Sequence, residues 1–257
     1  MMKKVIAIIQ ARMGSSRLPG KVMKDIGGEP VLQHVIARTK LAKSLKGVLV
    51  ATTIDPGDDA IEAFCITHSV PVFRGSVQDV LDRYYQAARQ FGADVVVRIT
   101  ADCPLIDAGL IDQTVAEFER RGVDFAANRL PPPFKRTFPI GLDVEVASFA
   151  ALERAWQEAT EKYEREHVMP YLYEKEGRFK VFVLNYAVDY GALRWTLDTP
   201  EDLELVRTVF ARFAPRTDFT WQEVLSLFQR EPGLAAINAG VAHKTYLDVD
   251  ERNKGSR

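Results

Sequence analysis

The feature that most constrains this chain is an apolar run that gives way abruptly to a polar, cationic turn. Residues 5–9 are all aliphatic, and a short apolar run bounded by turn residues predicts a buried strand. The following segment, 10–21, is rich in Gly, Ser and Pro and holds three cations, Arg12, Arg17 and Lys21. A buried strand that feeds such a loop is typical of α/β proteins that hold phosphate groups. We therefore expect a phosphate cradle here, with a solvated basic turn as the alternative.

Strands and helices alternate through the first half of the chain. The expected strands are 5–10, 48–53, 70–73 and 94–100, and the expected helices are 30–41, 56–66, 78–91 and 107–120. Alternation of this kind predicts parallel strands joined by right-handed crossovers. Loops that follow the carboxyl ends of these strands should then form the site.

The second half of the chain changes character. Strands are expected at 123–127, 142–146, 180–184 and 192–197, and helices at 149–157, 164–174, from 199 onward and at 219–239. The segment 129–139 is rich in proline and basic residues and predicts a mobile loop. The whole pattern predicts an α/β fold with a mostly parallel, mixed sheet between helices.

Composition excludes several classes of function. The formal net charge of the 257 residues is -1, so no broad basic surface is available for nucleic acid. The two cysteines give no disulfide framework, which fits a reducing, cytoplasmic location. The apolar run near the N-terminus is too short to span a membrane. We therefore expect a cytoplasmic protein that binds neither nucleic acid nor membrane.

The spacing of the cradle excludes two common phosphate-binding motifs. Five residues separate Gly14 from Gly20, and Val22 follows Lys21, whereas a P-loop needs four residues between its glycines and Ser or Thr after its lysine. The dinucleotide fingerprint fails as well, because no second glycine lies two residues after Gly14. What remains is a set of backbone amides and three cations, which suits a triphosphate.

Two aspartates follow expected strands. Asp102 lies just past the strand 94–100, where a carboxylate can hold Mg²⁺ together with substrate phosphates. Asp198 ends the expected strand 192–197 and precedes a strong helix start. Each also has an ordinary interpretation, Asp102 as a turn residue before proline and Asp198 as part of a helix N-terminus.

Acceptor residues are less marked. Asp143 and Glu145 lie two apart on an expected strand and so share one face, which either lines a pocket or faces water. His167 follows Arg165 and Glu166 in an expected helix and is the histidine most suited to a site. The segment between Asn128 and His167 is where we expect the acceptor to bind.

Five motifs taken together resemble those of the sugar cytidylyltransferases. This family includes the 3-deoxy-manno-octulosonate cytidylyltransferases, the CMP-sialic acid synthetases and the branch of the spore coat polysaccharide biosynthesis protein SpsF, to which the motifs are most similar. The motifs are QARMGSSRLPGK at 10–21, TADCPLID at 100–107, GLDVEV at 141–146, REHVMPY at 165–171 and RWTLDTPEDL at 194–203.

The resemblance implies a nucleotide-diphospho-sugar transferase fold, related to the GT-A and Rossmann-like folds, and a homodimer. It implies Mg²⁺-dependent transfer of a nucleotidyl group from CTP, with GTP as the alternative, to a sugar or sugar acid used in cell-surface polysaccharides. Site residues carry over as catalytic cations Arg12, Arg17 and Lys21; nucleotide-binding Gln10, Ala11, Gly14, Ser15, Ser16, Arg74, Gly75 and Ala101; acceptor-binding Asn128, Asp143, Glu145 and His167; and metal-binding Asp102 and Asp198.

Two other functions stay open at this point. A nucleotide-sugar-dependent glycosyltransferase would share the fold, but it normally has an Asp-x-Asp motif where this chain has only Asp102. A non-catalytic nucleotide-binding homologue would be expected to lack some of the charged site residues. In either case we expect a nucleotidyltransferase-like domain over 1–214 and a helical extension over 215–257 that packs on it.

Overall fold

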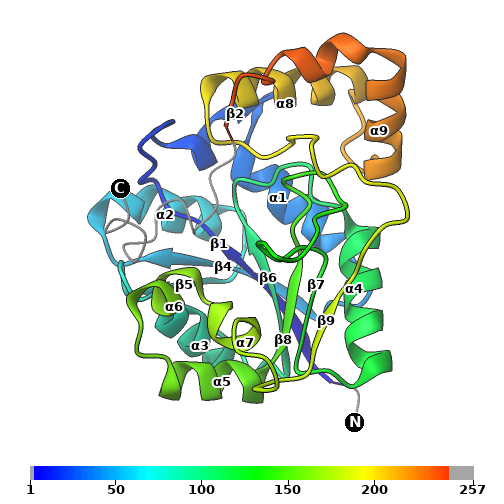
Figure 1. Cartoon of the computed structure of the whole chain (residues 1–257). Helices are drawn as coiled ribbons and strands as arrows, with labels where there is room; N and C mark the ends of the chain where they lie inside the picture. Colours follow the sequence, from blue (N-terminus) through cyan, green and yellow to red (C-terminus); the bar gives the residue numbers. More distant parts are fainter. Residues whose placement is uncertain (1–2, 243–257) are drawn as a thin grey trace, which may run out of the picture.

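A seven-stranded sheet forms the centre of the computed structural model, which describes residues 3–242 (Figure 1). Its strands are β1 (Val5–Gln10), β4 (Gly47–Thr53), β5 (Val72–Gly75), β6 (Val95–Thr100), β7 (Phe125–Ala127), β8 (Glu145–Ser148) and β9 (Val181–Val183). Their order is β5-β4-β1-β6-β8-β7-β9. Strands β5, β4, β1 and β6 are parallel, and β8 runs antiparallel to β6 and β7. The mixed, mostly parallel sheet predicted from the sequence is therefore confirmed.

Helices cover both faces of this sheet (Figure 1). One face carries α1 (Val31–Lys40), α2 (Asp59–Thr67), α4 (Ala108–Arg121), α8 (Pro200–Phe213) and α9 (Trp221–Arg230), and the other carries α3 (Val80–Gln90), α5 (Phe149–Glu158) and α7 (Pro170–Tyr173), with α6 (Lys162–His167) packed on α3. Shorter elements are the hairpin β2 (Asp25–Ile26) and β3 (Glu29–Pro30) and the 3-10 turns η1 (Lys21–Met23), η2 (Pro56–Asp58) and η3 (Pro232–Ala236).

Strand β1 shows why its sequence is apolar throughout. Successive side chains of a strand point to opposite faces. Ala7 and Ile9 accordingly join the core under α1 and α4, whereas Ile6 and Ile8 join the core under α3 and α5. All four side chains are buried, so a run of aliphatic residues is what this central position requires.

The strand order places a crevice beside β1. The chain builds β1, β4 and β5 in one direction and then crosses back to add β6 on the other side of β1. Loops that leave the carboxyl ends of β1 and β6 therefore diverge, and ligands of α/β proteins bind at such a switch point. Gln10 and Thr100 pair at the ends of these two strands and mark the floor of the crevice.

Two predicted strands are wrong in whole or in part. Segment 192–197 forms no strand: only Arg194 makes a β-bridge, to Ile140, and the alternating apolar residues are buried against helices instead, as the 5.3 Å ring distance between Trp195 and Phe228 shows. The strand expected at 142–146 begins only at Glu145, because the Asn128 side chain bonds the backbone of the residues before it.

The helix expected at 164–174 is interrupted. Helix α6 ends at His167 and α7 begins at Pro170, with Val168 between them at φ 72° and ψ -56°. The N–H of Met169 donates to the carbonyl of His167 at 2.9 Å, which makes a tight three-residue turn. A β-branched residue at positive φ is strained. The Val168 side chain is buried in the core, and its packing there keeps the backbone in this conformation.

The C-terminal part of the described chain packs on the same core as the sheet. Phe219 and Trp221 share a hydrophobic cluster with Val97 of β6. The extension predicted over 215–257 includes residues 243–257, which lie outside the described residues, and the boundary at 214/215 stays a prediction. Between residues 3 and 242, no helix has the length and apolar character needed to cross a membrane.

Candidate functional site

The loop after β1 is closed on itself and anchored from a distance. The N–H of Gly20 donates to the carbonyl of Met13 at 3.0 Å, and Gly20 adopts φ 65°, which favours glycine. The N–H of Met13 in turn donates to the carboxylate of Asp58 at 2.6 Å. Asp58 is buried and also accepts from the hydroxyl of Thr53 at the end of β4. The loop 13–20 is thus fastened to the neighbouring strand at one end and to itself at the other.

A cavity of about 290 Å³ lies over this loop at the crevice beside β1. It is lined by residues predicted for nucleotide, catalysis and metal, namely Gln10, Arg12, Gly14, Ser15, Ser16, Arg17, Lys21, Ala101, Asp102 and Asp198, together with Val22 and Thr100. Arg12 is exposed, and within residues 3–242 its guanidinium has no hydrogen-bond or ion-pair partner. An unpaired cation in a polar cavity is suited to bind an anion.

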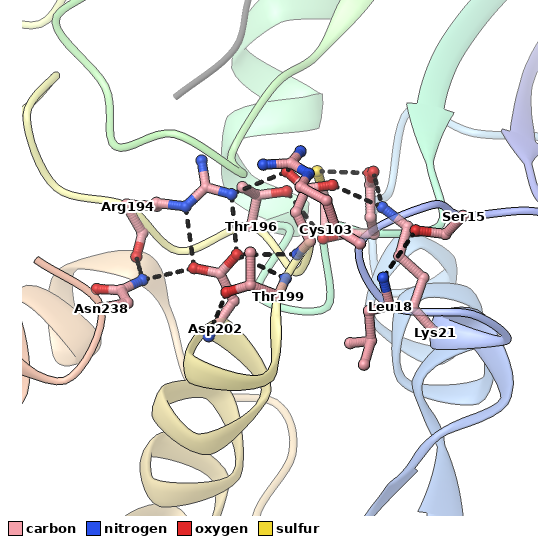
Figure 2. A network of polar contacts seen from close by, with 12 residues as sticks. Ser15, Leu18, Lys21, Cys103, Arg194, Thr196, Thr199, Asp202 and Asn238 are labelled. Carbon is pink, nitrogen blue, oxygen red and sulfur yellow. Dashed lines mark hydrogen bonds and ion pairs between the residues drawn. The ribbon is translucent and has the colours of Figure 1, made fainter. Parts of the chain in front are cut away.

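Lys21 joins the two predicted metal ligands. Its Nζ lies 2.7 Å from Oδ2 of Asp102 and 2.8 Å from Oδ1 of Asp198. Figure 2 shows Lys21 reaching from the cradle loop toward the segment that carries Thr196 and Thr199. Burial lowers the pKa of the Lys21 ammonium, but the two carboxylates outweigh this and the pKa is raised above 10.5. Lys21 is therefore charged at neutral pH.

Asp198 is surrounded by cations. Arg17 lies 3.0 Å and Arg194 2.8 Å from its Oδ2, on the side opposite Lys21. Burial alone would raise the pKa of Asp198, but Lys21, Arg194 and Arg17 together lower it from 3.8 to about 2. Asp198 is accordingly an anion over the whole physiological range of pH.

Asp102 and Asp198 bring carboxylate oxygens together at one point of the cavity. Asp102 and Asp198 both present an oxygen within 2.8 Å of one cationic atom, so the protein already gathers two anionic oxygens around a positive charge. Mg²⁺ prefers oxygen ligands and is commonly bound by one or two carboxylates plus substrate phosphates. Within residues 3–242, no group of three or more His, Cys, Asp or Glu side chains is placed to hold a metal ion.

A second cavity of about 240 Å³ adjoins the first. Four residues line both cavities, namely Arg17, Thr100, Asp102 and Asp198. The rest of the second cavity is lined by Arg98, Cys103, Arg129, Ile140, Gly141, Asp143, Glu145 and Thr196. The carboxylate pair therefore stands on the border between two chambers.

The wall of the second chamber carries fixed charges. The carboxylate of Asp143 accepts one hydrogen bond from Arg129, at 3.1 Å, and two from Arg136, the longer of them at 3.0 Å. Burial would raise the pKa of Asp143, but Arg136 and Arg129 outweigh it and hold the pKa far below 3.8. Glu145 forms an ion pair with Arg98. Asp143 is thus neutralised by two guanidinium groups, Arg129 in the lining of the chamber and Arg136 behind it.

Some predicted site residues lie outside both cavities. Arg74 is held by Asp59 and Glu62, each at 2.7 Å, and Gly75 is packed so that a Cβ would lie 2.9 Å from Phe73. Ala11 is buried beneath the cradle. Binding of the nucleotide by Arg74, Gly75 and Ala11 stays a prediction.

Two predicted acceptor residues are also outside the cavities. Asn128 is buried, and its amide donates to the carbonyl of Leu142 at 2.6 Å and accepts from the N–H of Val144 at 2.8 Å. It therefore shapes the wall next to Asp143. His167 ends α6 and lines neither chamber, so a direct role in acceptor binding stays a prediction for both residues.

Sequence reasoning missed several residues of the site. Arg98 and Thr100 belong to β6 and line the second cavity. In the sequence, two polar residues that alternate with apolar ones at the end of this strand indicated that both side chains lie on one face. Arg129 lies in the segment predicted as a mobile loop, and Asp58 in a helix start. Arg194 stands four residues before Asp198, but its contact with Asp198 has no counterpart in any sequence pattern.

Known proteins resemble this chain in sequence and in fold. Residues 6–213 match the family described as cytidylyltransferase. The spore coat polysaccharide biosynthesis protein SpsF of Bacillus subtilis is 31% identical over 91% of this chain and 98% of that protein. An 8-amino-3,8-dideoxy-manno-octulosonate cytidylyltransferase of Shewanella piezotolerans is 40% identical over 47% of this chain and 50% of that protein. The structure of a cytidylyltransferase from Leptospira borgpetersenii superimposes with a TM-score of 0.86 at 34% identity, over 94% of this chain and all of that one.

Proposed function

This chain belongs to the cytidylyltransferase family of nucleotidyltransferases, and we propose that it uses CTP to activate a sugar or sugar acid, with Mg²⁺ and release of pyrophosphate. The observation that carries the proposal is the pair of adjoining chambers with Asp102 and Asp198 on their border. One chamber suits the triphosphate and the other suits the acceptor. A reaction between the two ligands would take place at the border.

The first chamber supports binding of the triphosphate. Gly14, Ser15 and Ser16 line it with short side chains and backbone, and Arg12 offers an unpaired guanidinium within the described part of the chain. Arg17 and Lys21 face the same space. Charge on a departing pyrophosphate is stabilised by cations arranged beforehand in this way.

The reaction is an in-line displacement at the α-phosphorus. A bond forms between the acceptor oxygen and the α-phosphorus, the bond from that phosphorus to the bridging oxygen of the β-phosphate breaks, and pyrophosphate leaves with the electron pair. The proton of an attacking hydroxyl passes to solvent or to pyrophosphate. Positioning and charge neutralisation account for most of the catalysis in such transfers.

Asp102 and Asp198 would hold Mg²⁺, which when bound supplies positive charge to the phosphate oxygens. In its place the protein alone has the ammonium of Lys21. We infer that Lys21 turns toward the phosphates when both ligands are present. Its ammonium then pairs with the phosphate oxygens instead of the carboxylates of Asp102 and Asp198.

The second chamber supports an acceptor with an anionic or strongly polar group. Arg17 and Arg129 line it as possible partners for such a group, next to Asp143 and the ion pair of Arg98 with Glu145. The names of the Bacillus and Shewanella relatives point to polysaccharide precursors and sugar acids. We therefore place the product in cell-surface polysaccharide synthesis. The predicted homodimer is a separate proposal, checked by light scattering.

The test is a matrix of four nucleoside triphosphates against sugar acids and sugar 1-phosphates, with pyrophosphate release as the readout. The proposal predicts release that needs CTP, Mg²⁺ and an acceptor together. Arg129→Met should raise the acceptor KM without a matching change in the KM for CTP, whereas Arg89→Met, at an exposed position in the last turn of α3, is the control. The proposal would be contradicted if no pair of triphosphate and acceptor released pyrophosphate. It would also be contradicted if the protein turned over a preformed nucleotide sugar instead.

A further inference from the structure

A buried carboxylate behind Asp198 collects five hydrogen bonds. Oδ2 of Asp202 accepts from the N–H groups of Asp198 at 2.9 Å and Thr199 at 3.1 Å, and from Nη2 of Arg194 at 2.8 Å. Oδ1 accepts from Nε of Arg194 at 2.9 Å and from Nδ2 of Asn238 at 2.8 Å. Asp202 has no exposed surface. The five donors therefore fix the orientation of the Asp202 carboxylate.

This cluster controls where the carboxylate of Asp198 can point. Asp202 holds the backbone of Asp198 directly. It also holds one edge of the Arg194 guanidinium, Nε and Nη2, and this Nη2 reaches Oδ2 of Asp198 at 2.8 Å. Main chain and side chain of Asp198 are thus both set by the same buried carboxylate. A shift of Asp202 would move the border between the two chambers.

Asn238 reaches the cluster from the far end of the described chain. It follows η3, is 5% exposed, and donates from Nδ2 to Oδ1 of Asp202 at 2.8 Å and to the carbonyl of Arg194 at 3.0 Å. Figure 2 shows Asn238 on one side of Asp202 and Arg194 above it. The match to the family ends at residue 213. Asn238 therefore comes from a segment outside the matched part of the chain.

We propose that Asn238 is a positioning residue for the cation site, acting through Asp202 and Arg194 on Asp198. The inference rests on the proposed function, because that function gives Asp198 a metal to hold. Residues behind metal ligands set ligand orientation, and their loss typically lowers metal affinity about 10- to 100-fold. The C-terminal segment that follows residue 213 is then a working part of the site.

An isosteric substitution separates positioning from packing. Asn238→Asp keeps the shape of the side chain but replaces the Nδ2 donor by a carboxylate oxygen that faces Oδ1 of Asp202. Like charges at this distance repel strongly when buried. This repulsion lowers stability whatever the role of Asn238, so the Mn²⁺ affinity of the folded protein separates the two roles. If Asn238 merely fills space, the folded variants keep the wild-type affinity. If Asn238 acts as a donor, Asn238→Asp is at least as damaging as Asn238→Ala.

The experiment compares both variants with the wild type and with Gln229→Ala, which removes an exposed amide from α9 in the same part of the chain. Binding of Mn²⁺ in the presence of CTP is measured by electron paramagnetic resonance, and the Mg²⁺ concentration for half-maximal rate is measured at saturating CTP. We expect about 10-fold weaker Mn²⁺ binding or more for Asn238→Asp, a similar rise in the Mg²⁺ requirement, and wild-type values for Gln229→Ala.

Wild-type Mn²⁺ affinity in both Asn238 variants would overturn the inference, as would a loss confined to Asn238→Ala. If Asn238→Asp does not fold, Asn238→Ala alone decides, because a space-filling role predicts lower stability with unchanged Mn²⁺ affinity in the folded protein. Failure of the wild type to bind Mn²⁺ with CTP would overturn the proposed function, and this inference with it.

Discussion

Replacement of Lys21 by methionine should destabilise the free protein while sparing its fold. The substitution keeps a long unbranched side chain but removes the ammonium that lies 2.7 Å from Asp102 and 2.8 Å from Asp198. The two carboxylates then face each other without the charge that separates them. Removing one partner of a buried ion pair leaves an uncompensated charge, which costs up to about 3–5 kcal/mol. Partial exposure of all three side chains reduces this figure.

The pKa of Asp198 sets the size of the effect. It falls from 3.8 to about 2 under the influence of Lys21, Arg194 and Arg17, against the opposing effect of burial. One pKa unit corresponds to about 1.4 kcal/mol, so the net shift of Asp198, with burial set against the three cations, corresponds to ~2 kcal/mol of stability. Lys21 also pairs with Asp102. We therefore expect Lys21→Met to lower the free energy of unfolding by ~2 kcal/mol at pH 7.

The sign of the pH dependence follows from both partners. The lowered pKa of Asp198 gives stability that is complete above pH 3.8 and is lost as the pH falls toward 2. The raised pKa of Lys21 gives stability that is complete below pH 10.5 and is lost at higher pH. The difference between variant and wild type should thus be constant between about pH 5 and 10 and shrink in acid.

Urea denaturation across this pH range is the assay, with Lys24→Met as the control because Lys24 is exposed and three residues away. Mg²⁺ should stabilise Lys21→Met more than the wild type, since the carboxylates no longer hold an ammonium. Equal stability of Lys21→Met and wild type at pH 7, or a difference that widens in acid, would refute the reasoning.

Three further changes probe the supports of the site. Gly141→Ala should lower the free energy of unfolding by ~3 kcal/mol, because φ of Gly141 is 103° and a Cβ would lie 2.5 Å from the backbone nitrogen of Thr196. In the same denaturation assay Gly14→Ala should leave stability unchanged, because no atom lies within 4 Å of the added Cβ. Asp58→Ala orphans the N–H of Met13 and should raise the KM for CTP ~10-fold, since about 1–3 kcal/mol is lost from the anchor of the loop; an unchanged KM would separate this anchor from binding. Burial lowers the pKa of His34 below 6.5, so stability should fall as the pH drops below 6.5, and unfolding of His34→Gln at pH 5 and 7.5 should lack that part of the loss.

The local order of the site was predictable from the sequence because it follows from parallel strands. Carboxyl ends of neighbouring parallel strands meet at one edge, so the loops after 5–10 and 94–100 had to lie together. That rule brings the loops of Lys21 and Asp102 to the same edge of the sheet, and the strand order, which puts β6 beside β1, brings the two residues into contact. Asp198 was singled out because it followed an expected strand, and that strand does not exist. The resemblance to a family was the remaining reason to expect Asp198 in the site.

Contacts between distant segments were not predictable in the same way. Asp58 anchors Met13 across 45 residues, yet in the sequence it is one of two acids at a helix start. Asn238 bonds Arg194 across 44 residues. Both are polar side chains bonded to backbone groups, and hydrogen bonds of this type depend on packing that no local period encodes.

The strand predicted at 192–197 was wrong because this segment is an irregular loop that packs against the core. Alternating apolar residues at 192–197 predict a strand, but here Trp195 and Leu197 are buried by helices and by the loop after β6, with the N–H of Leu197 donating to the carbonyl of Asp102 at 2.8 Å. Alternation of apolar and polar residues indicates only that every second side chain is buried. A loop that packs against the core can have this pattern as well as a strand.

Label tracing with CTP tests the central claim most directly. The wild-type protein is incubated with an acceptor that supports pyrophosphate release and with CTP that carries ³²P at either the α or the γ position. The account predicts that the α label moves into a nucleotide–sugar product and the γ label appears only in pyrophosphate, and that Asp102→Asn slows both transfers ~10²- to 10³-fold. Appearance of the α label in CDP, or label transfer at the wild-type rate by Asp102→Asn, would contradict it.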